Sequence, residues 1–318
     1  MHTPPVAMHI PDGFLSVTVS AFFWVLSAVT IFFALRKVNR ELGEREVPVM
    51  GLLAAAIFAG QMLNFAVTGG TSGHLMGAAL AAILVGPWAA VLVMTAVVSV
   101  QALVYQDGGL LVLGANLFNM GIIGAFVGHF AYRAVRSLAR GKAWGILAGG
   151  FAAGWLSIVV SSLVVAFQLA LSGTSPANVA VPAMGGIHML IGVGEGLITL
   201  GALSFIYAAR RDLLKIGQPQ TGSDRAVWVG GLVITLALLV LSPLASANPD
   251  GLEWVAEQAG FLDRAEGPSY EIIPDYVLPG LTNEAAATIA AGVIGALIVL
   301  GVMLLLGYNR RRAAAREH

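Results

Sequence analysis

The sequence predicts an all-α, polytopic transmembrane helical bundle, and composition, apolar run length and charge placement all support this fold class. Of the 318 residues, 58% are hydrophobic and 11% are charged, and the mean hydropathy is +0.84. A soluble domain carries about 25% charged residues. Apolar runs of about 20 residues recur along the chain, and this is the length that a helix needs to cross a bilayer.

We expect about nine spans, seven in the first part of the chain and two in the second. The third is short, because its apolar run would extend only about 17 Å as a helix. It either begins earlier in the chain or packs inside the bundle as a partly inserted helix. The predicted spans are residues 14–35, 49–67, 75–85, 88–105, 113–132, 144–171, 184–207, 227–244 and 285–306.

Lysine and arginine are gathered in four groups, at residues 36–45, 133–142, 210–225 and 310–316, and only Arg264 lies outside them. Cytoplasmic loops of membrane proteins carry an excess of Lys and Arg. With nine crossings all four groups fall on one side, which predicts an N-terminus outside and a C-terminus in the cytoplasm. The short third run counts as a crossing here, because omitting it would put basic groups on both sides.

Two histidine-bearing stretches stand beside the first two spans: MHIPDGFL, residues 8–15, and TSGHLMG, residues 71–77. If these spans are antiparallel, both stretches emerge on the outer side. A chain that began at Met8 would offer its α-amine, the His9 backbone nitrogen and His9 Nδ1 in nearly one plane, and the His74 imidazole would complete a square. Square-planar nitrogen coordination suits Ni(II) or Cu(II), and imidazole also suits Co(II). Alternatively, both histidines are interfacial side chains without a ligand.

Polar residues within or beside the spans are candidates for orienting these ligands or lining an entry path. His188 and Glu195 are seven residues apart and therefore share a helix face, where ionisable groups are costly and often functional. Holding helices together by hydrogen bonds is an equally good explanation for such residues. The candidates are Gln61, Asn64, Ser72, Asn116, Asn119, His188 and Glu195.

These motifs, together with GPWAAVLVMTAVVSVQALVYQDGGLLVLGANLFNMG (residues 86–121) and GGIHMLIGVGEGLIT (residues 185–199), resemble the CbiM/NikM family. Its members are the substrate-capturing membrane components of energy-coupling-factor transporters for cobalt and nickel. The resemblance covers roughly residues 8–210. It implies metal ligation by the Met8 terminal amine, by the His9 backbone nitrogen and imidazole, and by the His74 imidazole.

The chain departs from the family pattern at its start, because MHTPPVA precedes the Met-His pair. This extension has no apolar segment of the kind found in a secretory signal. We therefore expect that initiation at Met8, or trimming to it, exposes the amine, and we favour a misassigned start.

Residues 217–225 predict a linker, because they are rich in Gly, Gln, Pro and Ser. It separates a metal-capturing membrane domain, residues 1–216, from a two-span module, residues 226–318.

The second part contains PDGLE at residues 249–253 and resembles the PDGLE domain, an accessory module fused to or found beside this family. The resemblance implies that this module assists metal loading. Its outer loop raises the local concentration of divalent cations or is only a solvated surface. The acidic residues of this loop are Asp250, Glu253, Glu257, Asp263, Glu266, Glu271, Asp275 and Glu284.

The absence of a nucleotide-binding motif from the sequence bears on whether this chain hydrolyses ATP itself. The chain has no G-x-x-x-x-G-K-[ST] phosphate-binding motif, so we expect no ATP hydrolysis by it. The resemblance implies a coupling transmembrane subunit and separate ATPase subunits as partners in the cell membrane. We expect no nucleic acid partner and no cofactor, and Ni(II) or Co(II) as the transported substrate. Two alternatives remain, namely a proton-coupled secondary transporter using Glu195 and an intramembrane metalloenzyme using His74, His188 and Glu195.

Overall fold

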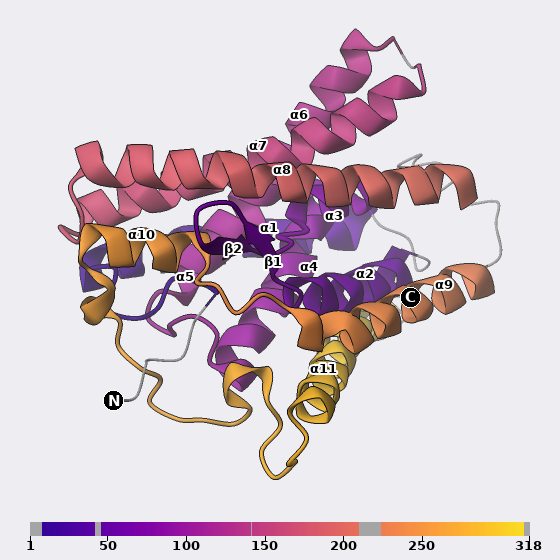
Figure 1. Ribbon diagram of the computed structural model, residues 1–318. Coiled ribbons are helices and arrows are strands. Elements are labelled where there is room, and N and C mark those ends of the chain that lie inside the picture. Colours follow the sequence, from indigo (N-terminus) through magenta and orange to yellow (C-terminus); the bar gives the residue numbers. More distant parts are fainter. Residues whose placement is uncertain (1–7, 42–45, 141, 210–223, 315–318) are drawn as a thin grey trace.

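The computed structural model describes residues 8–41, 46–140, 142–209 and 224–314. Helices dominate it, and one short β-hairpin joins two of them (Figure 1). The helices are α1 (Val17–Glu41), α2 (Glu46–Gln61), α3 (Ala78–Val85), α4 (Pro87–Val100), α5 (Leu113–Asn116), α6 (Gly124–Leu138), α7 (Trp144–Leu171), α8 (Ala177–Ala209), α9 (Asp224–Leu241), α10 (Gly251–Ala259) and α11 (Glu284–Ala314). The strands are β1 (Phe65–Val67) and β2 (Thr71–Gly73), which pair antiparallel.

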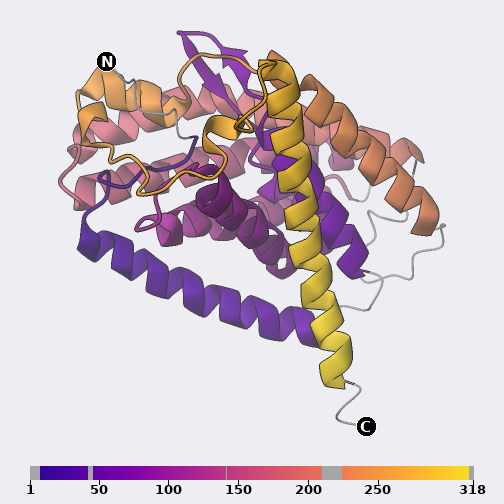
Figure 2. The same cartoon turned by 90° about the horizontal axis from the view of Figure 1, so that it is seen from below.

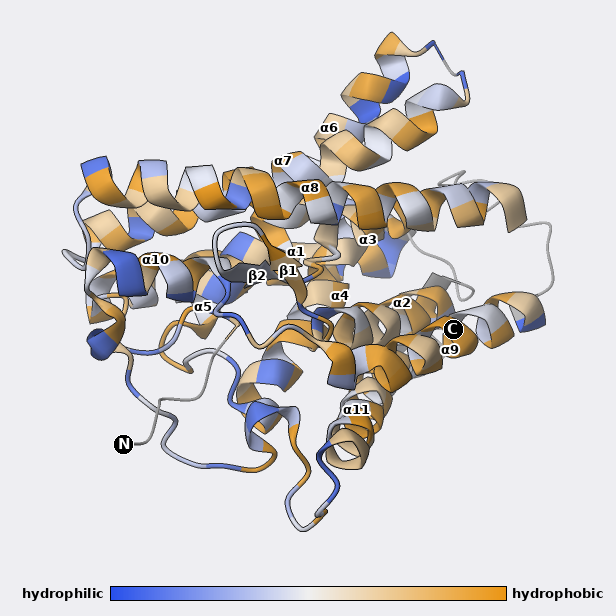
Figure 3. Ribbon diagram, viewed as in Figure 1, coloured by the Kyte–Doolittle hydropathy of each residue, from blue (hydrophilic) through white to orange (hydrophobic). Residues whose placement is uncertain are grey.

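Seven of the described helical segments are long and apolar enough to cross a membrane. They correspond to seven of the nine expected spans, and α7 has the predicted bounds. Two of these spans include π-helical segments, η1 (Gln101–Tyr105) after α4 and η2 (Leu117–Ile123) between α5 and α6. The loop between η1 and α5 lies beside the candidate site described below. Apolar residues recur along the long helices (Figure 3), as expected of helices that cross a membrane.

The second and third expected spans differ from the prediction. The second, predicted to end at residue 67, ends at Gln61, because residues 65–67 pair with residues 71–73 as a hairpin. The fold is all-α as predicted, and this short hairpin is a local addition to it within the described residues. The Gln61 side chain instead donates a hydrogen bond to the Met76 carbonyl, 2.9 Å away.

The third expected span forms only the eight-residue helix α3, which rises about 12 Å. It begins at residue 78 and not at 75, because Gly77 has a left-handed backbone with φ 78°, and the Glu195 carboxylate accepts hydrogen bonds from the Met76 and Gly77 N–H groups just before the helix. All of its residues except Leu84 are buried, and it packs against α4, α6 and α7. It is therefore a short helix enclosed by the bundle.

The C-terminal helices pack directly on the first part of the chain. Both α9 and α11 contact α2, and α11 runs across the bundle beside it (Figure 2). Between them, the loop that carries α10 passes over the end of the bundle where β2 and the first described residues lie (Figure 1). Most of the expected linker, residues 217–223, lies outside the described residues, and its last two residues belong to α9.

The enclosed position of α3 generates a stability prediction. A Cβ added at Gly128 of α6 would lie 2.6 Å from Ala79 Cβ and 2.7 Å from Ala79 Cα. Gly128→Ala should therefore force α3 and α6 apart and lower the free energy of unfolding by about 1–3 kcal/mol.

Thermal unfolding in detergent measures this change, with Gly201→Ala in α8 as the control, since a Cβ there meets nothing within 4 Å. Equal stability of the two variants would contradict the close packing of α3.

Candidate metal site

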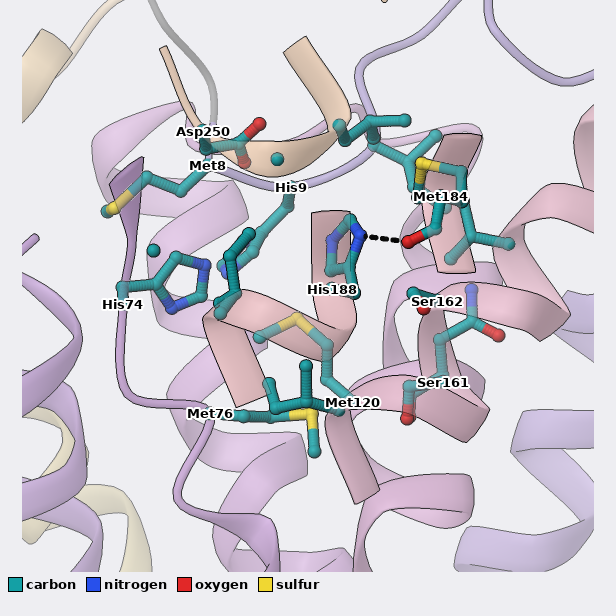
Figure 4. A pocket seen from close by; sticks show the side chains of 18 of the residues that line it. Met8, His9, His74, Met76, Met120, Ser161, Ser162, Met184, His188 and Asp250 are labelled. Atoms are coloured by element: carbon teal, nitrogen blue, oxygen red, sulfur yellow. Dashed lines mark hydrogen bonds between the residues drawn. The ribbon is translucent and has the colours of Figure 1, made fainter. Parts of the chain in front are cut away.

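The two histidines singled out in the sequence lie together. The His9 and His74 ring centroids are 5.9 Å apart, with the rings edge to face. His9 belongs to the segment before α1 and is 3% exposed, while His74 directly follows β2. The two rings border a cavity of about 100 Å³ that Met8 and His188 also line (Figure 4).

His9 is fixed by contacts from distant parts of the chain. Its Nδ1 lies 3.2 Å from the Asp107 carbonyl oxygen, and its Nε2 is buried without a hydrogen-bond partner. The Asn116 side chain pairs with the next residue, accepting from the Ile10 N–H and donating to the Ile10 carbonyl, both at 3.1 Å. These bonds hold an extended segment in place without any helix of its own.

Asp12 anchors the same segment to the loop before α5. Its carboxylate accepts hydrogen bonds from the Leu110 N–H at 3.0 Å and the Val112 N–H at 3.2 Å. The Ile10 carbonyl also accepts from the Gly109 N–H at 3.0 Å. Asp12 of the PDGF portion of the first motif therefore holds the loop that contains Asp107 in place by hydrogen bonds.

The segment after His74 depends on Glu195. This carboxylate is fully buried and accepts from the Met76 N–H at 2.7 Å and the Gly77 N–H at 3.0 Å. Glu195 does not line the cavity, whereas His188, seven residues earlier on α8, does. The two residues share the predicted helix face, but His188 borders the cavity whereas Glu195 binds the backbone of the His74 segment.

The remaining predicted residues divide into those that line the cavity and those that act elsewhere. Asn119 lines it and forms a paired amide contact with Gln168 of α7. Ser72 donates to the Asn248 carbonyl at 2.8 Å, and the Asn64 carbonyl accepts from the Ser246 N–H at 2.8 Å. Both therefore join the hairpin to the C-terminal loop, while Gln61 binds Met76 as described above.

The C-terminal loop closes the site from the other side. Ser72 and Asp250 form a parallel bridge, and Asp12 and Glu266 form an antiparallel one. Asp250, Gly251 and Leu252 of the PDGLE motif line the cavity. Both histidine-bearing segments are thus paired through their backbones with the C-terminal part of the chain.

Sequence reasoning missed several residues here. Asp107 stands in a Gln-Asp-Gly-Gly stretch that indicated only a loop, yet its carbonyl meets His9 and its carboxylate accepts a hydrogen bond from the Tyr276 hydroxyl. Three methionines that were not predicted to meet also line the cavity beside the expected Met8, because no spacing in the sequence indicates that they lie together. They are Met76, Met120 and Met184.

Burial favours the uncharged forms of His74 and Asp250 beside the cavity. Burial, with a further contribution from neighbouring His9, lowers the pKa of His74. Burial likewise raises the pKa of Asp250 to about 8. A neutral imidazole has a lone pair available for a metal ion. Among the described residues, no three His, Cys, Asp or Glu side chains are already arranged to hold a metal, so a site here must use other donors or close on the ion.

A polytopic helical bundle with two adjacent histidines at one end is typical of a membrane protein that binds metal ions. Residues 9–213 match the family model described as the CbiM cobalt uptake substrate-specific transmembrane region, and residues 225–312 match the PDGLE domain. The chain belongs to the CbiM family and carries a C-terminal PDGLE domain. It is therefore a nickel/cobalt transport membrane component and not an enzyme.

Individual relatives agree with this assignment. A putative fused nickel transport protein NikMN from Archaeoglobus fulgidus is 37% identical over 96% of this chain and 100% of its own length. A cobalt transport protein CbiM from Geobacter sulfurreducens is 33% identical over 77% of this chain and 73% of its own length. The crystal structure of a truncated transition metal transporter is 34% identical, with a TM-score of 0.57 over 63% of this chain and 98% of that one.

The two hydrogen bonds to Glu195 generate a prediction for the site. Glu195→Gln keeps the side-chain volume but replaces one acceptor oxygen with an amide donor, which leaves a buried N–H of the His74 segment unpaired at a cost of about 1–3 kcal/mol. We expect affinity for Ni(II) or Co(II) to fall by about 10–100-fold, as when other groups that orient a ligand are lost.

Isothermal titration calorimetry of the variant and the unaltered chain measures this difference. Thr199→Val is the matched control, because Thr199 lies one turn further along α8 and its buried hydroxyl has no partner. Unchanged affinity in Glu195→Gln would show that the His74 segment does not need this anchor.

Proposed function

We propose that this protein is the substrate-capturing membrane component of an ATP-driven energy-coupling-factor importer of Ni(II) or Co(II). The observation that carries the proposal is the meeting of His9 and His74 at one cavity in a chain of the CbiM family. The ligands are the Met8 terminal amine, the His9 backbone nitrogen and imidazole, and the His74 imidazole.

This ligand set requires two changes relative to the described arrangement. Residue 8 must begin the chain, and residues 1–7 lie outside the described part of it. The His9 ring must also release the Asp107 carbonyl, because the chelate uses the same Nδ1 that now faces that oxygen. The side chains of Met8 and His74 already border the cavity, so neither change needs a rearrangement of the helices.

The orientation follows from the charge distribution. The basic groups predict that the histidine end faces outward, with the N-terminus outside and the C-terminus in the cytoplasm. In support, α1 begins beside the site and has Arg40 in its last turn. Capture then occurs outside, and partner subunits, namely a coupling membrane subunit and two ATPases, supply the energy for release inward.

We further propose two modules, residues 1–216 and 226–318, joined by a linker at residues 217–225. The backbone bridges at Asp250 and Glu266 support a role for the second module in shaping the site. Four nitrogen donors in a plane favour nickel by geometry, and a fused relative carries nickel in its name, so we place Ni(II) ahead of Co(II).

The proposal predicts which residues nickel binding requires. In a chain that begins at Met8, His9→Ala and His74→Ala should each lower Ni(II) affinity by at least about 100-fold, because loss of a ligand costs more than loss of a group that orients one. The matched control is His129→Ala, since His129 lies on α6 against the Ala82 carbonyl and not in the cavity.

Unchanged affinity in both ligand variants would contradict the capture site. Uptake of metal by this chain alone, in vesicles without ATPase or coupling subunits, would instead favour a proton-coupled secondary transporter.

A further inference from the structure

The three histidines that line the cavity share one feature. Each places Nδ1 near a backbone carbonyl oxygen: His9 near Asp107 at 3.2 Å, His74 near Leu75 at 3.1 Å and His188 near Met184 at 2.7 Å. A carbonyl oxygen only accepts hydrogen bonds, so each of these contacts is a hydrogen bond when Nδ1 carries the proton, and in that tautomer Nε2 keeps the lone pair. Histidines that bind metals usually have their second nitrogen held in this way.

The three rings reach the cavity from different parts of the chain. His9 and His74 form the edge-to-face pair, and His9 Nε2 is buried without a partner. His188 approaches from α8, with one ring nitrogen on the Met184 carbonyl and the other edge of the ring facing the cavity (Figure 4). The capture site proposed above uses only two of these imidazoles and leaves His188 without a task.

Gly251 of the PDGLE motif keeps space open next to His188. A Cβ added at this residue would lie 2.9 Å from His188 Nε2, 2.8 Å from its Cε1 and 2.6 Å from Ile191 Cδ1. Any side chain at residue 251 would therefore push the imidazole away from its present position. The turn at the start of α10 thus borders the nitrogen that carries the lone pair.

We propose that His188 is a third imidazole ligand, and that the cavity holds a divalent transition metal ion through Nε2 of His9, His74 and His188 when the nitrogen of residue 8 is a peptide amide. Three imidazoles and a water molecule suit tetrahedral Co(II) or Zn(II). The site rests on the proposed capture function, because it shares His9 and His74 with it. The rings are not yet converged, so the ion draws His188 towards the pair.

The two ligand sets differ in the nitrogen that His9 uses. The amine-dependent site needs His9 Nδ1 and must break its contact with Asp107, whereas the three-imidazole site keeps that contact and uses the unpartnered Nε2. The state of residue 8 therefore selects the coordination. With a free amine the ion is planar and independent of His188, and without one the ion is tetrahedral and requires His188.

The test compares two full-length backgrounds with Co(II) and Ni(II) as probes. The first begins at Met1 and carries His2→Ala, so that residue 8 is an amide and His2 cannot bind metal. The second begins at Met8. In the first background we expect intense visible absorption of tetrahedral Co(II), which His188→Ala abolishes together with a loss of affinity of about tenfold or more. In the second, His188→Ala should leave the Ni(II) affinity and its planar spectrum unchanged.

Two further variants provide a second test of the third ligand and a control for it. Gly251→Ala should reproduce the loss of Co(II) absorption by displacing the ring, even if His188→Ala fails to fold, and His129→Ala should bind Co(II) as the unaltered chain does. An unchanged Co(II) spectrum and affinity in both His188→Ala and Gly251→Ala, with loss in His74→Ala, would overturn the third ligand and leave the capture function intact. Unchanged binding in His74→Ala as well would contradict both.

Discussion

The site depends on hydrogen bonds that fix two extended backbone segments within a helical membrane protein. Neither the segment of His9 nor that of His74 lies in a helix, so each needs partners for its backbone polar groups, which cannot remain unpaired when buried. Asn116 supplies them to Ile10, and Glu195 supplies them to Met76 and Gly77. Since both partners are themselves buried in the bundle, the positions of the two imidazoles follow from how the helices pack.

The C-terminal PDGLE domain belongs to the same arrangement. Its loop pairs with Ser72 on one histidine-bearing segment and with Asp12 on the other. Tyr276 extends this contact, because its hydroxyl binds the carboxylate of Asp107, whose carbonyl meets His9. A module that touches both segments can influence the distance between the two imidazoles, which gives a physical reason for joining it to the CbiM-like region in one chain.

Much of the fold could be predicted from apolar run length, and α7 agrees with its predicted bounds because Lys142 and Ser172 bracket the run. The nearness of His9 and His74 could likewise be predicted from two antiparallel spans, although their role as ligands stays a prediction. Asp107 and Gly251 could not be found in this way. Asp107 is 98 residues from His9, and Gly251 lies next to His188 of a different helix, so neither contact could be inferred from a local sequence pattern. The shortness of α3 could be predicted from its apolar run, but its start at residue 78 could not, because the Glu195 carboxylate that holds the Met76 and Gly77 N–H groups is more than 100 residues away in the sequence.

The most direct test of the central claim is nickel K-edge X-ray absorption of the loaded chain that begins at Met8. The account predicts a first shell of four nitrogen donors with the pre-edge feature of a planar ion, because the proposed ligands are the amine, the amide and the two imidazoles. Sulfur in the first shell would instead assign the ion to the methionines that line the cavity. A six-coordinate shell of oxygen and nitrogen without the planar feature would also contradict the account.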